Sequence, residues 1–204
     1  MTYLDYSATT PIDEEVIDSF VKASKYIGNP NSLHKLGLEA KHLIDASTKQ
    51  IAEILNVKPE EIIYTSGASE ANNLAIKGME AYKRGNHIIT TDLEHSSIYG
   101  PINYLTEQGY EVDFVPLKSG IVDIEALEKL ITDKTILVSI GCVNSETGIR
   151  QPIEQIGKML KKYPKVIFHS DITQAVGKVK VDLTDVDLAS FAAHKFFGIK
   201  GIGA

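Results

Sequence analysis

Short apolar segments rich in β-branched residues recur along this chain, with helical segments between them. The expected strands lie at 61–65, 87–91, 111–116, 135–140, 165–169 and 187–191. The expected helices lie at 36–55, 69–82, 96–107, 124–131 and 153–162. Strands that are apolar throughout and alternate with helices are typical of a parallel sheet buried on both faces. The pattern therefore predicts an α/β fold whose mostly parallel sheet is covered by helices on both faces.

The two ends of the chain depart from this pattern. Residues 1–14 predict an N-terminal arm, and residues 15–204 predict one large domain that opens with a helix and a turn cluster at 29–32. Residues 201–204 begin another apolar segment, and the chain stops inside it. We therefore expect the front part of a longer protein, with a domain that is incomplete at its C-terminal end.

Charge and cysteine content exclude several classes of function. Lysine and arginine number 21 against 27 acidic residues, and this net charge of −6 argues against generic binding to nucleic acid or to a membrane surface. The longest uncharged apolar run, 135–145, is too short to cross a bilayer, and the N-terminus lacks the pattern of a signal peptide. The single cysteine, Cys142, excludes an intrachain disulfide and a cysteine-cluster metal site. We expect a cytoplasmic protein.

The first candidate for chemistry follows the expected strand at 61–65 and opens a helix. Its sequence is Thr65-Ser66-Gly67-Ala68-Ser69-Glu70. Small residues at a helix N-terminus let backbone N–H groups bind an anion such as a phosphate. A helix cap at Ser66 or Ser69 with no ligand explains the same residues.

Two further candidates follow later strands. Asp171 comes at the end of the strand region at 165–171, where an acid can hold a cationic ligand or a protonated ring nitrogen, although a cap or turn role is the alternative. His169 lies two residues earlier, but no third ligand with suitable spacing accompanies the pair, so we expect no metal site. Lys195 has small and apolar neighbours, which favour a nucleophilic amine with a lowered pKa; a lysine reaching to solvent is the alternative.

His95 and the polar turn at 143–148 also come directly after expected strands. Either can be purely structural. Together, however, the five segments offer an anion site, an imidazole, an amide, an acid and a lysine at the edge where α/β sheets bind ligands. This set meets the needs of pyridoxal 5'-phosphate, whose phosphate, ring nitrogen and aldehyde require a helix terminus, a carboxylate and a lysine.

Ordered blocks of sequence also resemble the cysteine desulfurases, in the NifS/IscS branch of the fold type I, class V pyridoxal-phosphate enzymes. The blocks are YLDYSATTP (3–11), GNPNSLH (28–34), YTSGASEANNLAIKG (64–78), EHSSI (94–98), VNSETG (143–148), HSDITQAVGK (169–178) and HKFFGIKGIGA (194–204). The resemblance runs over the whole chain.

The resemblance implies a role for eight residues. Lys195 would bind the cofactor covalently, and Asp171 would pair with its ring nitrogen. His95 would stack on the ring and help to move protons, and Gln174 would bond the ring hydroxyl oxygen. The remaining roles are contact with the ring or substrate by Asn144 and binding of the phosphate by Ala68, Ser69 and His194.

Two positions depart from the family pattern. Threonine is frequent in the family where this chain has Ser69, a change that keeps the hydroxyl. Serine, a phosphate ligand, is usual where this chain has Ala192. Loss of a hydrogen bond to a charged group costs about 1.5–3 kcal/mol, so the resemblance implies weaker, though not abolished, cofactor binding.

The family's nucleophilic cysteine and its carboxylate-binding arginine lie beyond the lysine, and this chain stops before both. The C-terminal small domain is missing as well. Cys142 stands at the end of an apolar strand, so we interpret it as a structural thiol. The 204 residues alone are therefore expected to be inactive.

The implied function is conversion of L-cysteine to L-alanine, with sulfur held as an enzyme persulfide. The family implies a homodimer and a sulfur-acceptor protein such as an iron–sulfur scaffold, or delivery to tRNA thiolation. Two alternatives stay open from the residues alone. One is a related class V enzyme, either an aminotransferase or a selenocysteine lyase, and the other is a non-catalytic copy that dimerises or binds a partner.

Overall fold

Five parallel strands form the central sheet of the computed structural model, which describes residues 2–204. In spatial order they are β2 (Glu111–Phe114), β1 (His87–Thr90), β5 (Thr135–Ser139), β6 (Ile167–Asp171) and β7 (Leu188–Ser190). A separate antiparallel ribbon is formed by β3 (Leu117–Lys118) and β4 (Ile121–Val122). The predicted parallel sheet is therefore confirmed.

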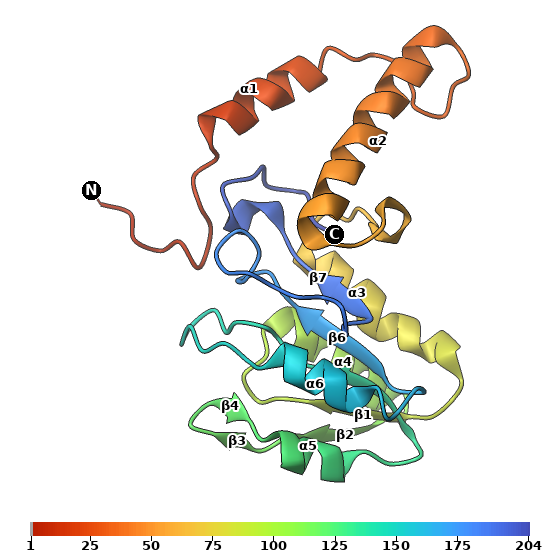
Figure 1. Cartoon of the computed structure of the whole chain (residues 1–204), viewed down its shortest axis with the longest axis vertical. Coiled ribbons are helices and arrows are strands. Elements are labelled where there is room, and N and C mark those ends of the chain that lie inside the picture. Colours follow the sequence, from red (N-terminus) through yellow and green to blue (C-terminus); the bar gives the residue numbers. More distant parts are fainter. Residues whose placement is uncertain (1) are drawn as a thin grey trace.

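Helices cover both faces of this sheet (Figure 1). They are α3 (Ala68–Lys77), α4 (Ser96–Glu107), α5 (Ile124–Leu130) and α6 (Ile153–Leu160). Adjacent residues of β1 serve opposite faces, because side chains alternate along a strand. Ile88 packs with α3 and α4, whereas Ile89 packs with α5 and α6. Both faces are buried, as the sequence predicts.

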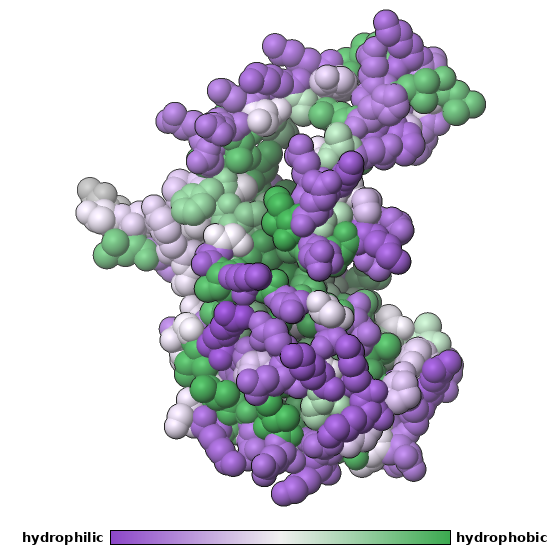
Figure 2. Space-filling view, in the orientation of Figure 1, coloured by the Kyte–Doolittle hydropathy of each residue, from purple (hydrophilic) through white to green (hydrophobic). Residues whose placement is uncertain are grey.

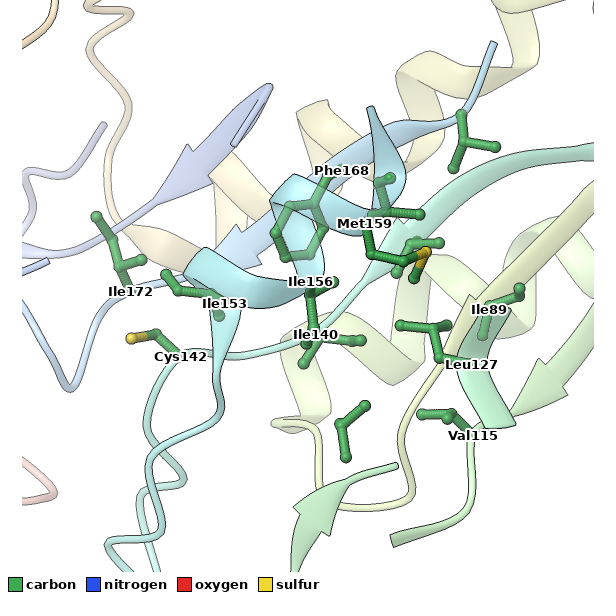
Figure 3. Packing of buried hydrophobic residues seen from close by; sticks show 14 of the residues in the cluster. Ile89, Val115, Leu127, Ile140, Cys142, Ile153, Ile156, Met159, Phe168 and Ile172 are labelled. Atoms are coloured by element: carbon green, nitrogen blue, oxygen red, sulfur yellow. The ribbon is translucent and has the colours of Figure 1, made fainter. Parts of the chain in front are cut away.

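The larger of the two cores lies on the α6 face. Ile153 and Ile156 of α6 are fully buried and lie beside Ile140 and Phe168 of the sheet region (Figure 3). The helix repeats apolar residues at the spacing that turns one stripe toward the sheet, which explains why it forms here.

The N-terminal part lies apart from the sheet (Figure 1). It contains α1 (Glu14–Ala23) and α2 (Lys35–Leu55), joined by the predicted turn cluster. No residue of α1 is buried, and the Phe20 side chain is 56% exposed. Figure 2 shows apolar surface gathered between these helices and the sheet. The predicted arm, 1–14, leads into α1 at its cap Asp13, and its first residue lies outside the described part.

The expected strand at 61–65 is wrong. Pro59–Glu61 is a short 3-10 helix, η1, and only Thr65 forms a bridge, antiparallel to Gly203. Ile63 is 62% exposed, so this segment lacks the burial on both faces that its composition suggests. A strand needs a partner along its length, and within residues 2–204 only Gly203 supplies one here.

Other boundaries move by a few residues. The helix expected at 69–82 becomes α3 followed by a 3-10 helix, η2 (Gly78–Tyr82), because glycine is a poor residue for continuing an α-helix. The strand expected at 165–169 runs two residues later, so Asp171 is the last residue of β6. Among residues 2–204, no helix is both long and apolar enough to cross a membrane.

The core on the α6 face generates a stability prediction. Ile156→Ala should lower the free energy of unfolding by about 2–5 kcal/mol, because it leaves a cavity in a packed interior. The matched control is Ile54→Ala, whose side chain is 81% exposed and should change stability by less than about 0.5 kcal/mol. Urea unfolding midpoints measure both, and equal effects would contradict the assignment of this core.

Candidate functional site

A cavity of about 610 Å³ opens at the carboxyl edge of the sheet. Its walls come from the loops that follow β1, β5, β6 and β7, together with the N-terminus of α3. All eight residues predicted from the sequence line it: Ala68, Ser69, His95, Asn144, Asp171, Gln174, His194 and Lys195. The structure therefore brings together segments that are up to 127 positions apart, from 68 to 195, in the sequence.

The position of the cavity follows from the strand order. β1 pairs with β2, the next strand along the chain, and also with β5 on its other side. The loop after β1 leads to α4 on one face, and the loop after β5 leads to α6 on the opposite face. The two loops thus diverge, and a parallel sheet binds ligands at such a switch point.

Asp171 is fixed through both carboxylate oxygens. Oδ1 accepts a hydrogen bond of 2.9 Å from the backbone N–H of Thr173, which is the turn role considered from the sequence. Oδ2 accepts one of 2.8 Å from the Asn72 side-chain amide. The carboxylate is therefore held rigidly beside the cavity, with lone pairs left for a ligand.

Lys195 ends a short 3-10 helix, η3 (Ala193–Lys195), and is half-buried. Its Nζ donates to the backbone oxygens of Ser7, at 2.7 Å, and Ala8, at 2.9 Å. Burial lowers the pKa of this amine, and the charges of Asp171 and Asp5 oppose that shift. A lowered pKa increases the neutral fraction of the amine, which is the nucleophilic form.

The N-terminal arm closes over the lysine segment. The backbone N–H of Thr10 donates a hydrogen bond of 2.9 Å to the backbone oxygen of His194. The Thr10 hydroxyl accepts a hydrogen bond of 2.7 Å from the N–H of Phe197. The His194 ring contacts the Thr9 hydroxyl at 3.1 Å. Burial, followed by the charges of Lys195 and Lys200, lowers the pKa of His194. This imidazole is therefore held toward its neutral form at the cavity wall.

Gln174, in the segment that follows β6, also binds the N-terminal arm. Its Nε2 donates to the Ser7 oxygen at 2.8 Å, and its Oε1 accepts 2.6 Å from Lys178. Ser7 therefore accepts hydrogen bonds from both Gln174 and Lys195. Burial and the charge of Lys195 lower the pKa of Lys178.

The N-terminus of α3 faces the cavity without a side-chain cap at Gly67. Ser66, a cap candidate from the sequence, donates instead from its N–H and hydroxyl to Glu70, at 2.6 and 2.7 Å. The N–H groups of Ala68 and Ser69 belong to the first turn, which a helix leaves without internal partners. The expected helix cap at Ser66 is therefore wrong, and anion binding at this helix terminus stays a prediction.

Close backbone packing aligns this helix terminus with the lysine segment. A Cβ added at Gly203 would lie 2.7 Å from the Gly67 Cα and 2.6 Å from the Phe191 oxygen. No side chain fits between these segments, so glycine is required at 203. The contact joins the expected phosphate site to the chain just before Lys195.

His95 and Asn144 stand on the two loops of the switch point. His95 caps α4, with Nδ1 accepting 3.1 Å from the N–H of Ser97. The side-chain amide of Asn144 donates a hydrogen bond of 2.7 Å to the backbone oxygen of Leu93, and its Oδ1 accepts one of 2.8 Å from the N–H of Thr147. The amide thus has the turn role considered from the sequence and ties the two loops together. A ring or substrate contact by Asn144 stays a prediction.

Sequence reasoning missed two residues of the site. The Glu94 carboxylate accepts a hydrogen bond of 2.7 Å from the Thr91 hydroxyl. It accepts another, of 3.0 Å, from the N–H of Gly141 across the switch point. Burial raises its pKa to about 7. Asn72 is fully buried behind Asp171. The position of Glu94 beside His95 was an available signal, whereas the contact of Asn72 depends on how α3 packs.

Comparison with known protein families identifies the family of this chain. A family model described as aminotransferase class V matches residues 2–204. The chain belongs to the class V aminotransferase family.

The similar curated proteins are named more specifically than this family, as cysteine desulfurases. The cysteine desulfurase IscS of Pectobacterium carotovorum is 46% identical over 211 residues, and that of Rickettsia bellii is 43% identical over 210. Each alignment covers 99% of this chain but only 52% and 51% of the relative. The chain therefore spans about half the length of the curated relatives it matches. The resemblance to cysteine desulfurases is confirmed for this half.

Solved structures agree with the fold. A NifS-like protein superposes with a TM-score of 0.94 at 38% identity, covering 99% of this chain and 57% of that one. A structure titled SspA in complex with cysteine superposes with a TM-score of 0.93 at 35% identity, covering 100% of this chain and 60% of that one. A cysteine desulfurase from Thermococcus onnurineus NA1 superposes with a TM-score of 0.90 at 31% identity, covering 98% of this chain and 52% of that one.

The thiol and the histidine that the sequence singled out both lie in the interior of this class V fold. Cys142 is fully buried beside Ile153 and Ile172 (Figure 3), and burial raises its pKa to about 11. His169 lies buried between the hydroxyls of Ser139 and Ser190, 2.9 Å from each, and burial lowers its pKa. Within residues 2–204, no group of three or more candidate ligands could hold a metal ion.

Glu94 generates a pH prediction. Burial raises its pKa from 4.5 to about 7, so the folded protein holds a proton that the unfolded chain releases between these values. The stability that this group contributes is therefore complete below about pH 4.5 and is lost as the pH rises toward 7. Glu94→Gln keeps an acceptor oxygen and removes the titration. Urea unfolding should show wild type losing stability relative to Glu94→Gln as the pH rises over this interval. A difference independent of pH would contradict the assignment.

Proposed function

We propose that this chain is the pyridoxal-phosphate-binding part of a cysteine desulfurase. In that reaction, sulfur leaves L-cysteine as the persulfide of an enzyme thiol, and L-alanine remains. The observation that carries the proposal is the convergence of Lys195, Asp171 and the N-terminus of α3 on one cavity. The names of the relatives support the substrate, although they describe proteins about twice as long.

The cavity fits pyridoxal 5'-phosphate by its size and by its donor set. Its volume of about 610 Å³ lies in the usual range of small-molecule sites. The helix terminus at Ala68 supplies free N–H groups for a phosphate, Asp171 supplies a fixed carboxylate for a ring nitrogen, and Lys195 supplies an amine. Three different groups of the cofactor thus find the partner that each needs.

The binding roles are those that the family resemblance implies, for residues that line the cavity. Ala68, Ser69 and His194 would hold the phosphate, Asp171 the ring nitrogen and Gln174 the ring hydroxyl. Asn144 would approach the ring or substrate from the loop after β5. Ala192 is buried at the cavity wall, where a serine hydroxyl would add a phosphate contact, so weaker binding stays a prediction.

When bound, the cofactor supplies an electron sink for negative charge at the substrate α-carbon. Asp171 would keep the ring nitrogen protonated, because its carboxylate is fixed through both oxygens. Lys195 would take up or return a proton at the α-carbon, since burial favours its neutral amine. His95, on the loop after β1, would assist this transfer through its imidazole. The arm carbonyls of Ser7 and Ala8 must release the amine before it reacts.

Sulfur transfer requires a thiolate that this chain does not offer. Its single cysteine is buried, and its pKa of about 11 keeps it protonated at neutral pH. We therefore place the nucleophilic cysteine outside these 204 residues. The remaining parts of the proposal are a homodimer, a cytoplasmic location and delivery of sulfur to an acceptor protein such as an iron–sulfur scaffold.

Covalent labelling tests the cofactor site. Incubation with pyridoxal phosphate and reduction with borohydride should place the phosphopyridoxyl group on Lys195, read by peptide mapping. Lys195→Ala should abolish the visible absorbance of the bound cofactor. Lys162→Ala is the control, because this lysine is 63% exposed and pairs with Glu128 on the surface. Labelling of another lysine would contradict the assignment of Lys195. A colourless wild-type protein that cannot be reconstituted with the cofactor would favour a non-catalytic, partner-binding role.

Turnover tests the place of the thiol. The 204-residue chain, with cofactor, L-cysteine and a reductant, should produce no more alanine than free pyridoxal phosphate does. A 1 Å misplacement of reacting groups can cost about a hundredfold, and here the acceptor thiol is missing from the cavity altogether. Sustained alanine production that disappears in Cys142→Ala would show that the buried thiol had been misread.

A further inference from the structure

Asn72 links two parts of the site that the proposed function treats as separate. It lies on α3 and is fully buried. Its Nδ2 donates 2.8 Å to Oδ2 of Asp171 and 2.9 Å to the hydroxyl oxygen of Ser97. Ser97 follows the loop of His95 in the first turn of α4. One amide group therefore touches both the acid and the segment that carries the imidazole.

The neighbouring carboxylate fixes the orientation of this amide. If the amide were turned over, its oxygen would face the Asp171 oxygen at hydrogen-bond distance, and two acceptors repel each other. In the observed orientation, Oδ1 is buried and has no hydrogen-bond partner within residues 2–204. Leaving a buried acceptor unpaired is costly, so the contact with Asp171 must outweigh that cost.

The fixed amide gives the next hydrogen bond a direction. The Ser97 hydroxyl oxygen accepts from Asn72, so its own proton is free to point at Nδ1 of His95, 2.8 Å away. The backbone N–H of Ser97 also donates to Nδ1, at 3.1 Å. An imidazole nitrogen that accepts hydrogen bonds carries no proton, so the proton of the neutral ring is on Nε2.

We propose that Asn72 is a positioning residue that sets the tautomer of His95 through Ser97. The chain Asp171–Asn72–Ser97–His95 runs in one direction and keeps Nε2 of the imidazole as a proton donor. The catalytic meaning of this network rests on the proposed function. Its geometry stands on the protein's own side chains, without the cofactor.

The network assigns a specific role to the imidazole. With Nδ1 occupied by Ser97, neutral His95 donates a hydrogen bond only from Nε2. His95 lines the cavity, so a donor is set beside the site where Lys195 is proposed to move a proton. The neutral histidine would therefore act as a hydrogen-bond donor from Nε2, while its unprotonated nitrogen faces Ser97.

Nitrogen NMR of the histidine rings tests the tautomer directly. In ¹⁵N-labelled protein without cofactor, two-bond ¹H–¹⁵N correlations distinguish the Nε2–H and Nδ1–H forms, and His95→Gln assigns the signal among the six histidines. Wild type should show the Nε2–H form. Asn72→Leu should raise the fraction of the Nδ1–H form by roughly two- to tenfold, the range expected for one lost hydrogen bond.

Neighbouring residues supply the controls. Asn73→Leu changes the next residue of α3, which is half-buried and whose amide donates to the Ser69 backbone oxygen instead of Asp171, and it should leave the tautomer unchanged. Ser97→Ala should match Asn72→Leu, and the double variant should add nothing further, because both residues act through one hydroxyl. Ser97→Ala also provides the test if Asn72→Leu does not fold.

Two results would overturn the proposal. One is a wild-type His95 in the Nδ1–H form or in an equal mixture. The other is an unchanged tautomer in both Asn72→Leu and Ser97→Ala. Failure of cofactor loading at Lys195 is a separate outcome, which would remove the proposed function and leave this network as measured.

Discussion

Strand polarity is the constraint on which the rest of this molecule depends. All five strands of the sheet run in the same direction, so the residues that follow them emerge at one edge. The sheet order places β5 next to β1, and the chain leaves these two strands toward opposite faces. A crevice at that edge is a geometric result of the topology, before any catalytic side chain is considered.

Polar contacts keep the crevice at a defined width. The Glu94 carboxylate accepts from Gly141 on the other side, and the Asn144 amide donates to the oxygen of Leu93 in return. Asn72 adds a third connection from the helix that lies behind. None of these groups needs to touch a ligand to matter, because each fixes a backbone segment that carries one that does.

Local sequence patterns predicted most of the fold and five candidate segments at the cavity wall, and the family resemblance named the eight residues within them. Apolar strands and the residues that end them are local features, and the parallel topology then brings those ends together. The segment 61–65 failed because pairing is not local: only Thr65 meets a partner, at Gly203. Asn72 was missed for the same reason, since its partner Asp171 lies 99 positions away, and the contact of Glu94 with Gly141 spans 47 positions although its place beside His95 is local. The side-chain role of Asn144 in its turn, by contrast, was readable from the turn itself.

The contact between the N-terminal arm and Lys195 also bears on how the protein folds. The hydrogen bond from Lys195 to Ser7 joins residues 188 positions apart, and those of Thr9 and Thr10 with His194 close loops of similar length. Closing a long loop costs entropy that local contacts do not, so such contacts form late in folding. The sheet and its flanking helices can therefore assemble while the arm is still free. Until it docks, the Lys195 amine lacks the backbone oxygens of Ser7 and Ala8 as partners, so this wall of the cavity is completed only when the two ends of the sequence meet.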